Sequence, residues 1–213
     1  PAAWMEGSEV GAHLRPVTRP GKRQLPESYG SPYGLLPLRQ RIALMLAERS
    51  INVDPTQVLL TQGANDALDM IVRHFIEPGD PVLVDNPGYY PLFGKLRLAK
   101  AKLIGVRRNA DGPDPEDLAH LAATTGAKLF FTQSLAHNPT GCSITLPVAY
   151  RLMQVATQHH LRIVDTDPFA DILPAGSPRL AALDQLDRVI YVGTFAKTLS
   201  ASLRSGYIAA DAD

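Results

Sequence analysis

Residues 189–208 read VIYVGTFAKTLSASLRSGYI, a stretch that combines a predicted strand, a polar loop and a second apolar run. The run 189–192 is short, apolar and rich in β-forming residues, which predicts a buried strand. Lys197 lies in the polar segment that follows, and Arg204 precedes the second apolar run at residues 207–209. The pattern therefore places one lysine and one arginine between two buried runs.

Lys197 is a candidate nucleophile. A lysine just past a buried strand is partly desolvated, which favours its neutral, nucleophilic amine, and such an amine forms a Schiff base with an aldehyde. Thr194 and Arg204 add a hydroxyl group and a fixed cation, which suit a phosphate. The other interpretation is a loop with an ordinary surface lysine and arginine, and this stretch alone leaves both open.

The composition of the 213-residue chain is that of a globular domain, with 45% hydrophobic and 20% charged residues. Its 21 basic and 21 acidic side chains cancel, which removes any general attraction to nucleic acid or to an anionic membrane. We expect neither a membrane span nor a signal peptide. Cys142 is the only cysteine, so an internal disulfide is impossible and a cytoplasmic location is expected.

Short apolar strands alternate with amphipathic helices along the chain. Apolar residues at helical spacing predict helices at residues 35–50, 64–75, 115–124 and 147–159. Apolar runs predict strands at residues 58–60, 82–84, 102–106, 129–132, 161–164, 189–192 and 207–209. This alternation is typical of an α/β layered fold with a mostly parallel sheet.

Residues 1–28 carry several prolines among arginines and lysine, which predicts a linker or N-terminal arm and no folded element. Residues 29–213 are then expected to form one domain. The pairs His159–His160 and His74 with Asp69 lack the spacing of metal ligands, so no metal site is predicted.

Polar residues gather where the predicted strands end, in the stretches 61–65, 85–90, 133–141, 165–169 and 193–197. Ligands of α/β folds bind at the carboxyl ends of the strands, so we expect these stretches to form one site. Gly63 precedes Ala64 and Asn65 at a predicted helix start. Free N–H groups and the helix dipole make such a position favourable for an anion.

Three other strand ends carry side chains that suit a flat heteroaromatic ligand. Tyr89 can stack on such a ring, or it can simply pack at the rim of the fold. Asn138 stands before a proline, which holds the backbone extended and directs an amide that can donate to a phenolic oxygen. An aspartate of residues 165–169 can pair with a protonated ring nitrogen, or it can be an ordinary acidic strand end.

Together and in this order, these motifs resemble the large domain of fold type I, pyridoxal-phosphate-dependent aminotransferases of class I/II, over about residues 29–210. The resemblance implies a three-layer α/β/α fold, a mixed and mostly parallel sheet of about seven strands, and pyridoxal 5'-phosphate as cofactor. It implies that Lys197 forms the Schiff base, that Tyr89 stacks on the pyridine ring and that Asn138 bonds the phenolic oxygen. The implied phosphate ligands are Thr194, Arg204 and the backbone of Gly63, Ala64 and Asn65.

The same resemblance adds a substrate residue and a subunit contact. Gly34, within Tyr33-Gly34-Leu35, resembles the segment beside the substrate carboxylate. Tyr29 resembles the tyrosine that reaches the phosphate of the neighbouring subunit, which implies a homodimer. The implied small-molecule partner is an amino acid or an amine.

The sequence departs from this family around the cofactor ring. Counting from Asn138, the position of the aspartate that faces the ring nitrogen falls on Thr166, and the position of a nearby tyrosine falls on Phe169. Either the strand end bends so that Asp167 serves, or the Thr166 hydroxyl faces the nitrogen. A hydroxyl does not hold the nitrogen protonated, so the cofactor would be a weaker electron sink.

Within the family, residues 29–34, 86–89 and 193–199 most resemble the aminotransferase-like domain of MocR/GntR-type transcriptional regulators. This implies an effector-sensing domain that reaches DNA only through a domain outside this chain. The alternatives are a stand-alone aminotransferase that acts on an amino acid and a 2-oxo acid, and a catalytically silent dimerisation scaffold. We expect a longer protein with a C-terminal small domain, so full transamination by this fragment alone is doubtful.

Overall fold

The computed structural model describes residues 10–18, 30–174 and 176–211. Its centre is an eight-stranded sheet with the strand order β1-β8-β7-β6-β5-β2-β3-β4. The strands are β1 (Val58–Thr61), β2 (Pro81–Asn86), β3 (Lys102–Asn109), β4 (Gly112–Pro113), β5 (Leu129–Thr132), β6 (Arg162–Asp167), β7 (Val189–Thr194) and β8 (Gly206–Ala209).

Most of this sheet is parallel. Strands β3, β2, β5, β6 and β7 pair in parallel, whereas β8 runs antiparallel to both β1 and β7. The two-residue strand β4 adds a short antiparallel pair with β3. The predicted α/β fold with a mixed, mostly parallel sheet is therefore confirmed, and β4 is the strand that the prediction lacked.

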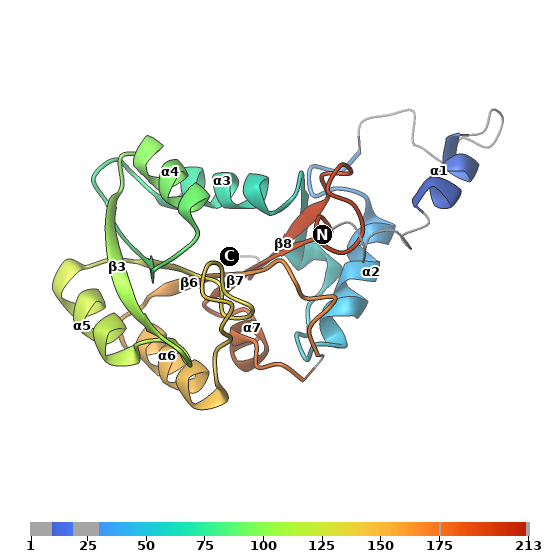
Figure 1. Ribbon diagram of the computed structural model, residues 1–213. Helices are drawn as coiled ribbons and strands as arrows, with labels where there is room; N and C mark the ends of the chain where they lie inside the picture. The colour runs from blue at the N-terminus through green and yellow to red at the C-terminus, as the bar shows by residue number, and fades with distance from the viewer. Residues whose placement is uncertain (1–9, 19–29, 175, 212–213) are drawn as a thin grey trace.

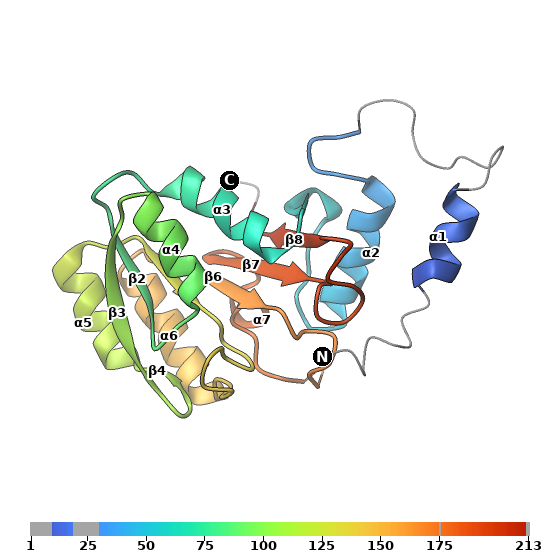
Figure 2. The ribbon, with the colours of Figure 1, turned by 45° about the horizontal axis from the view of Figure 1, so that its top comes forward.

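Helices cover both faces of the sheet. The helices of the described residues are α1 (Val10–Thr18), α2 (Leu36–Ala47), α3 (Ala64–Phe75), α4 (Tyr90–Leu98), α5 (Pro115–Thr125), α6 (Leu146–Gln158) and α7 (Leu180–Asp184), with a short 3-10 turn η2 (Pro55–Gln57); α1 lies apart from the sheet. Figure 1 and Figure 2 show α3 and α4 on one face and α5, α6 and α7 on the other. This arrangement gives the three layers that the family resemblance implies.

Two apolar clusters hold these layers together, one on each face. Helix α3 has an apolar face that packs on the sheet. Its residues Leu68, Ile71 and Val72 recur at helical spacing and are all buried. On the opposite face, α6 buries Leu152 and Ala156 in the same way. Full burial of one such large apolar side chain contributes roughly 1.5–3 kcal/mol, so these faces fix the helices on the sheet.

The structure differs from the predicted elements at three helices. Residues 1–28 were expected to hold no folded element, yet Val10–Thr18 form helix α1 despite Pro16 in its interior. Helices α4 and α7 were not predicted. Helix α4 carries Pro91 in its first turn, where proline is tolerated, and Gly94, a poor helix former, in its interior; it forms where Leu92 and Leu96 pack into the core. None of the helices within the described residues is long and apolar enough to cross a membrane.

Candidate active site

A cavity of about 250 Å³ lies where β1, β2, β5, β6 and β7 end. It is lined by Ala64, Asn65, Leu68, Tyr89, Gln133, Asn138, Thr166, Pro168, Phe169, Thr194, Ala196, Lys197, Ala201 and Arg204. The carboxyl ends of parallel strands meet at one edge of a sheet, which is why segments far apart in the sequence converge here. The structure thus brings most of the predicted site residues to one hollow.

One corner of the cavity is built around Gly63 and Arg204. Gly63 precedes helix α3 with a φ of +86°, a backbone conformation that favours glycine. A Cβ atom at Gly63 would lie 3.2 Å from Arg204 Nη2, so the missing side chain leaves room for the guanidinium. Arg204 Nη2 also donates to the Gln62 carbonyl oxygen at 3.3 Å. A cation therefore stands against a helix N-terminus, where the first backbone N–H groups have no partner within the helix.

Thr194 and Asn65 add polar groups to this corner. The Thr194 hydroxyl donates to the Ser205 carbonyl oxygen at 3.2 Å and accepts from the Ala196 backbone N–H at 3.2 Å. Asn65 Oδ1 is buried and makes no hydrogen bond to any described residue. A buried polar atom without a partner costs stability, so its place in a cavity wall is consistent with a site that takes a polar ligand.

The amine, the aromatic ring and the amide that the sequence singled out share this cavity. Lys197, Tyr89 and Asn138 all contribute to its wall. Lys197 is exposed in the described chain, so the expected desolvation by the strand end is not observed. Phe169 and Leu68 supply apolar surface beside these groups.

Strand β6 separates the two residues that the sequence left as alternatives at the ring nitrogen. Thr166 lines the cavity, and its hydroxyl donates to the Thr132 carbonyl oxygen at 3.3 Å. Asp167 points to the opposite face, where its Oδ2 accepts from Arg179 Nε and from the Tyr191 hydroxyl, each at 2.9 Å. The side-chain alternation of a strand explains this difference.

The neighbouring Asp165 also turns away from the cavity. Its Oδ1 accepts from the Ser134 backbone N–H at 3.0 Å, and its Oδ2 accepts from the Ser134 hydroxyl at 2.7 Å. Burial raises the pKa of the Asp165 carboxyl to about 7. Among the described residues, no aspartate or glutamate lines the cavity.

Gly34, like Asp167, is a predicted site residue that lies away from the cavity wall. Gly34 is outside the residues that line the cavity; a Cβ atom there would come within 2.6 Å of the Leu60 side chain, and its carbonyl oxygen accepts from Arg39 Nε at 3.2 Å. Gly34 thus packs against β1 in this chain. Tyr29 lies outside the described residues.

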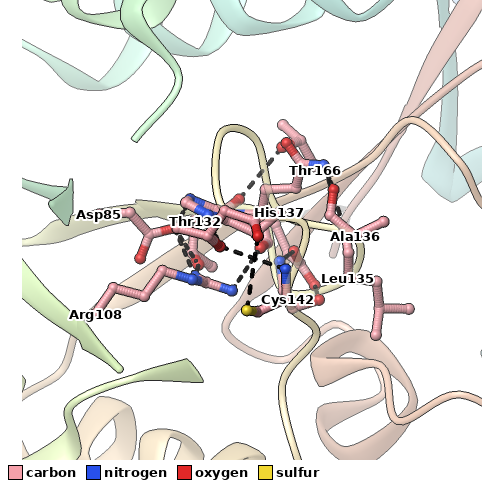
Figure 3. A network of polar contacts seen from close by, with 12 residues as sticks. Asp85, Arg108, Thr132, Leu135, Ala136, His137, Cys142 and Thr166 are labelled. Atoms are coloured by element: carbon pink, nitrogen blue, oxygen red, sulfur yellow. Dashed lines mark hydrogen bonds and ion pairs between the residues drawn. The ribbon is translucent and has the colours of Figure 1, made fainter. Parts of the chain in front are cut away.

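A buried polar network behind the cavity was not predicted from the sequence. Figure 3 shows that Asp85, Arg108 and His137 come together from β2, β3 and the loop after β5. Asp85 and His137 belong to stretches with unusual polar content, which was the signal that could have found them. Arg108 gave none, because an arginine in a strand is normally taken as exposed.

Comparison with known proteins shows the family of this chain. Residues 19–213 match the family model described as aminotransferase class I and II. The chain belongs to this family. Its members typically use pyridoxal phosphate, and the solved α-aminoadipate aminotransferase LysN from Thermus thermophilus was crystallised with N-(5'-phosphopyridoxyl)-L-leucine. LysN is 28% identical, with a TM-score of 0.85 over 97% of this chain and 52% of LysN.

Curated relatives of the aminotransferase domain include both enzymes and regulators. Aromatic-amino-acid aminotransferase 1 of Thermococcus litoralis is 31% identical over 86% of this chain and 46% of its own length. The probable rhizopine catabolism regulatory protein MocR of Rhizobium meliloti is 34% identical over 76% of this chain and 32% of its own length. The chain thus spans half or less of the curated relatives that it matches.

The residues present fit pyridoxal phosphate in most respects. The corner formed by Gly63, Arg204 and the start of α3 offers a cation and backbone N–H groups to a phosphate. The remaining wall offers an amine, an amide and an aromatic ring. The exception is the position of Thr166, where the cavity has a hydroxyl and no carboxylate.

Proposed function

We propose that this chain binds pyridoxal phosphate in the cavity at the strand ends and holds it covalently through Lys197. The observation that carries the proposal is that eight residues predicted from separate motifs line one cavity: Ala64, Asn65, Tyr89, Asn138, Thr166, Thr194, Lys197 and Arg204. Lys197 would hold the cofactor through its amine, which is the group that can form a Schiff base with an aldehyde. When bound, the cofactor supplies a carbonyl that exchanges amines and a ring that withdraws electrons.

The side chains around Lys197 bind and orient the cofactor. Arg204 and Thr194, together with the N-terminus of α3, hold the phosphate. Tyr89 stacks on the ring and Asn138 donates to its phenolic oxygen. These side chains would orient the cofactor toward the Lys197 amine.

The same site lacks a carboxylate that would strengthen electron withdrawal by the cofactor ring. Thr166 presents a neutral hydroxyl to the ring nitrogen, so no carboxylate stabilises a proton there. Phe169 lines the cavity but has no hydroxyl to donate to the phenolic oxygen. The site therefore suits the capture of an amine more than rapid transfer of its amino group.

We propose that the setting of this domain is a MocR-type transcriptional regulator, in which an amino acid or amine acts as effector. Similarity to MocR of Rhizobium meliloti and the neutral side chains at Thr166 and Phe169 support this setting. DNA would be contacted through a domain outside this chain. A homodimer is expected, with Tyr29 near the neighbouring site.

A stand-alone aminotransferase is the second candidate. Similarity to the Thermococcus litoralis enzyme favours it, as does the presence of Lys197, Asn138 and Arg204 in one cavity. The full-length protein distinguishes the two when it is offered aromatic amino acids or 2-aminoadipate with a 2-oxo acid. Catalytic turnover supports the enzyme, whereas a spectral change without turnover supports the sensor.

Absorbance tests the covalent site. Addition of pyridoxal phosphate to the protein is expected to produce a visible band, and borohydride reduction is expected to fix the cofactor on the peptide that contains Lys197. The band should be absent from Lys197→Ala and unchanged in Lys102→Ala, an exposed lysine at the opposite end of the sheet. A missing band in the unmodified protein, or a band that persists in Lys197→Ala, would contradict the proposal and favour a silent scaffold.

A further inference from the structure

Behind the cavity, a single buried carboxylate oxygen of β2 contacts β3, the end of β5 and the loop that follows β5. Asp85 Oδ2 accepts from Arg108 Nη1 at 2.9 Å, from the Thr132 hydroxyl at 2.8 Å and from the Gln133 backbone N–H at 3.2 Å. His137 Nε2 lies 3.4 Å from the same oxygen. We call these five residues the Asp85 network, and Figure 3 shows most of it. It links β2, β3, the end of β5 and the loop that follows β5.

This network is deeply buried. The side chains of Arg108 and His137 are 0% and 1% exposed, and that of Asp85 is 4% exposed. Removal of one partner from a buried ion pair leaves an uncompensated charge, which typically costs about 3–5 kcal/mol. The position of Asp85 is therefore held firmly by the strands on either side of it.

His137 connects this fixed carboxylate to the loop ahead of it. Its Nδ1 contacts the Thr140 hydroxyl at 2.9 Å. Its backbone N–H donates to the Cys142 carbonyl oxygen at 2.8 Å, and its carbonyl oxygen accepts from the Gly141 N–H at 2.6 Å. Side chain and backbone together thus hold both ends of the turn at residues 137–142.

The protonation state of His137 makes these contacts constant over a wide pH range. Burial, aided by the nearby Arg108 cation, lowers the pKa of His137 to about 4. Because Nε2 lies 3.4 Å from the Asp85 carboxylate, we expect the neutral ring to carry its proton on Nε2 and to accept from the Thr140 hydroxyl on Nδ1. Neither contact changes when the cofactor is titrated near neutral pH.

The backbone contacts of His137 lie directly beside Asn138. It follows His137 directly and lines the cavity, whereas His137 is absent from the cavity wall. Asn138 itself is exposed, so little packing holds its amide in place. The position of that amide must come from the backbone on either side of it.

We propose that His137 is a positioning residue, which transfers the fixed position of Asp85 to the Asn138 amide and so sets the charge on the phenolic oxygen of the bound cofactor. This inference rests on the proposed cofactor site and adds a role for a side chain that does not touch the cofactor. Asn138 donates to the phenolic oxygen and draws charge from it. If the amide moves away, the oxygen keeps more negative charge and holds the proton of the adjacent lysine–cofactor bond more tightly.

The test is a pH titration of visible absorbance in the cofactor-loaded protein. His137→Leu removes both ring contacts and is expected to raise the midpoint of the titration by about one pH unit, the size expected for one lost hydrogen bond to a charged group. His137→Gln keeps an N–H within reach of Asp85 and should retain a midpoint close to that of the unmodified protein. An unchanged midpoint in His137→Leu overturns the inference.

A double-variant comparison shows whether His137 acts through Asn138. Asn138→Ala should raise the midpoint as His137→Leu does, and the double variant should show no further rise because both changes remove one interaction. Additive shifts would overturn the inference. Asp114→Ala is the matched control, since Asp114 is a buried aspartate that pairs with Arg107 and caps α5, and among the described residues it has no hydrogen bond or ion pair to the Asp85 network. It should lower stability and leave the midpoint unchanged.

The outcomes separate the two proposals. If the unmodified protein gives no visible band, the cofactor site itself is wrong. If it gives the band and His137→Leu titrates normally, the cofactor site stands and the positioning role is wrong. The amount of cofactor fixed by borohydride in each variant confirms that the comparison concerns equally loaded protein.

Discussion

Arg179 Nε lies 2.9 Å from Asp167 Oδ2, and both side chains are only 1% exposed. The Tyr191 hydroxyl donates to the same carboxylate oxygen. Asp167 is therefore part of the core on the face opposite the cavity. This pairing leaves Thr166 as the β6 residue that reaches the cavity.

Substitution of Asp167 should affect stability far more than cofactor binding. Asp167→Ala leaves the buried Arg179 charge without its carboxylate and is expected to lower the free energy of unfolding by about 3 kcal/mol or more. Asp171→Ala is the control, because Asp171 pairs with Arg49 at a partly exposed position and such pairs contribute about 1 kcal/mol or less. Denaturant unfolding measures both, and a shifted visible band in folded Asp167→Ala would show that Asp167 faces the cofactor after all.

Thr166→Asp should make the bound cofactor a better electron sink. A carboxylate at this position would stabilise a proton on the ring nitrogen, so amino-group transfer by the full-length protein should rise by about tenfold or more. Thr166→Val removes the hydroxyl at nearly constant shape and should give no gain. Steady-state rates with a fixed amino donor measure the effect, and equal rates in both variants would contradict it.

Alanine substitutions at Gly63 and Gly79 separate the effect of backbone strain from the effect of a contact with Arg204. Both have positive φ, +86° and +99°, but only Gly63 has Arg204 within reach of an added Cβ atom. Gly63→Ala and Gly79→Ala should each lose about 1–3 kcal/mol of stability. Only Gly63→Ala should also weaken pyridoxal phosphate binding, by about tenfold. Fluorescence titration measures the binding, and equal affinities in the two variants would argue against a phosphate at this corner.

The raised pKa of Asp165 predicts that the stability of the fold depends on pH. Its pKa in the folded chain is about 7, whereas an unfolded aspartate has a pKa of about 4. The folded state therefore binds more protons between these values, and the contribution of Asp165 to stability falls as pH rises from about 4 to about 7. Asp165→Asn removes this effect.

The difference between variant and unmodified protein isolates Asp165. The free energy of unfolding of Asp165→Asn, minus that of the unmodified protein, should increase with pH from about 4 to about 7 and stay constant above. Other titrating groups, such as His137, contribute to both proteins and cancel. Denaturant unfolding over a pH series measures it, and a difference that does not vary with pH would show that the carboxyl titrates normally.

Much of the fold could be predicted because its signals are local. The helix predicted at residues 64–75 coincides with α3, and the strand predicted at residues 129–132 coincides with β5. A helical period and a short apolar run can both be recognised from neighbouring residues alone. The gathering of Asn138, Thr194 and Lys197 also followed from the sequence, because parallel strands end at one edge.

Helices α1, α4 and α7 could not be predicted from the local sequence. Pro16 in α1 and Gly94 in α4 argue against a helix by propensity. Burial of Leu92 and Leu96 against the sheet outweighs that local preference in α4. Helix α7 has only five residues, which is too short for a periodic signal.

The sequence by itself determined the α/β alternation, the strand-end location of the site and the identity of its lysine, amide and arginine. The tertiary structure decided that Thr166 and not Asp167 lines the cavity, and that Asp85, Arg108 and His137 form one buried network. Charged side chains are expected at the surface unless their partners are known. Those partners come from separate strands and loops, so only the folded chain brings them within hydrogen-bonding distance.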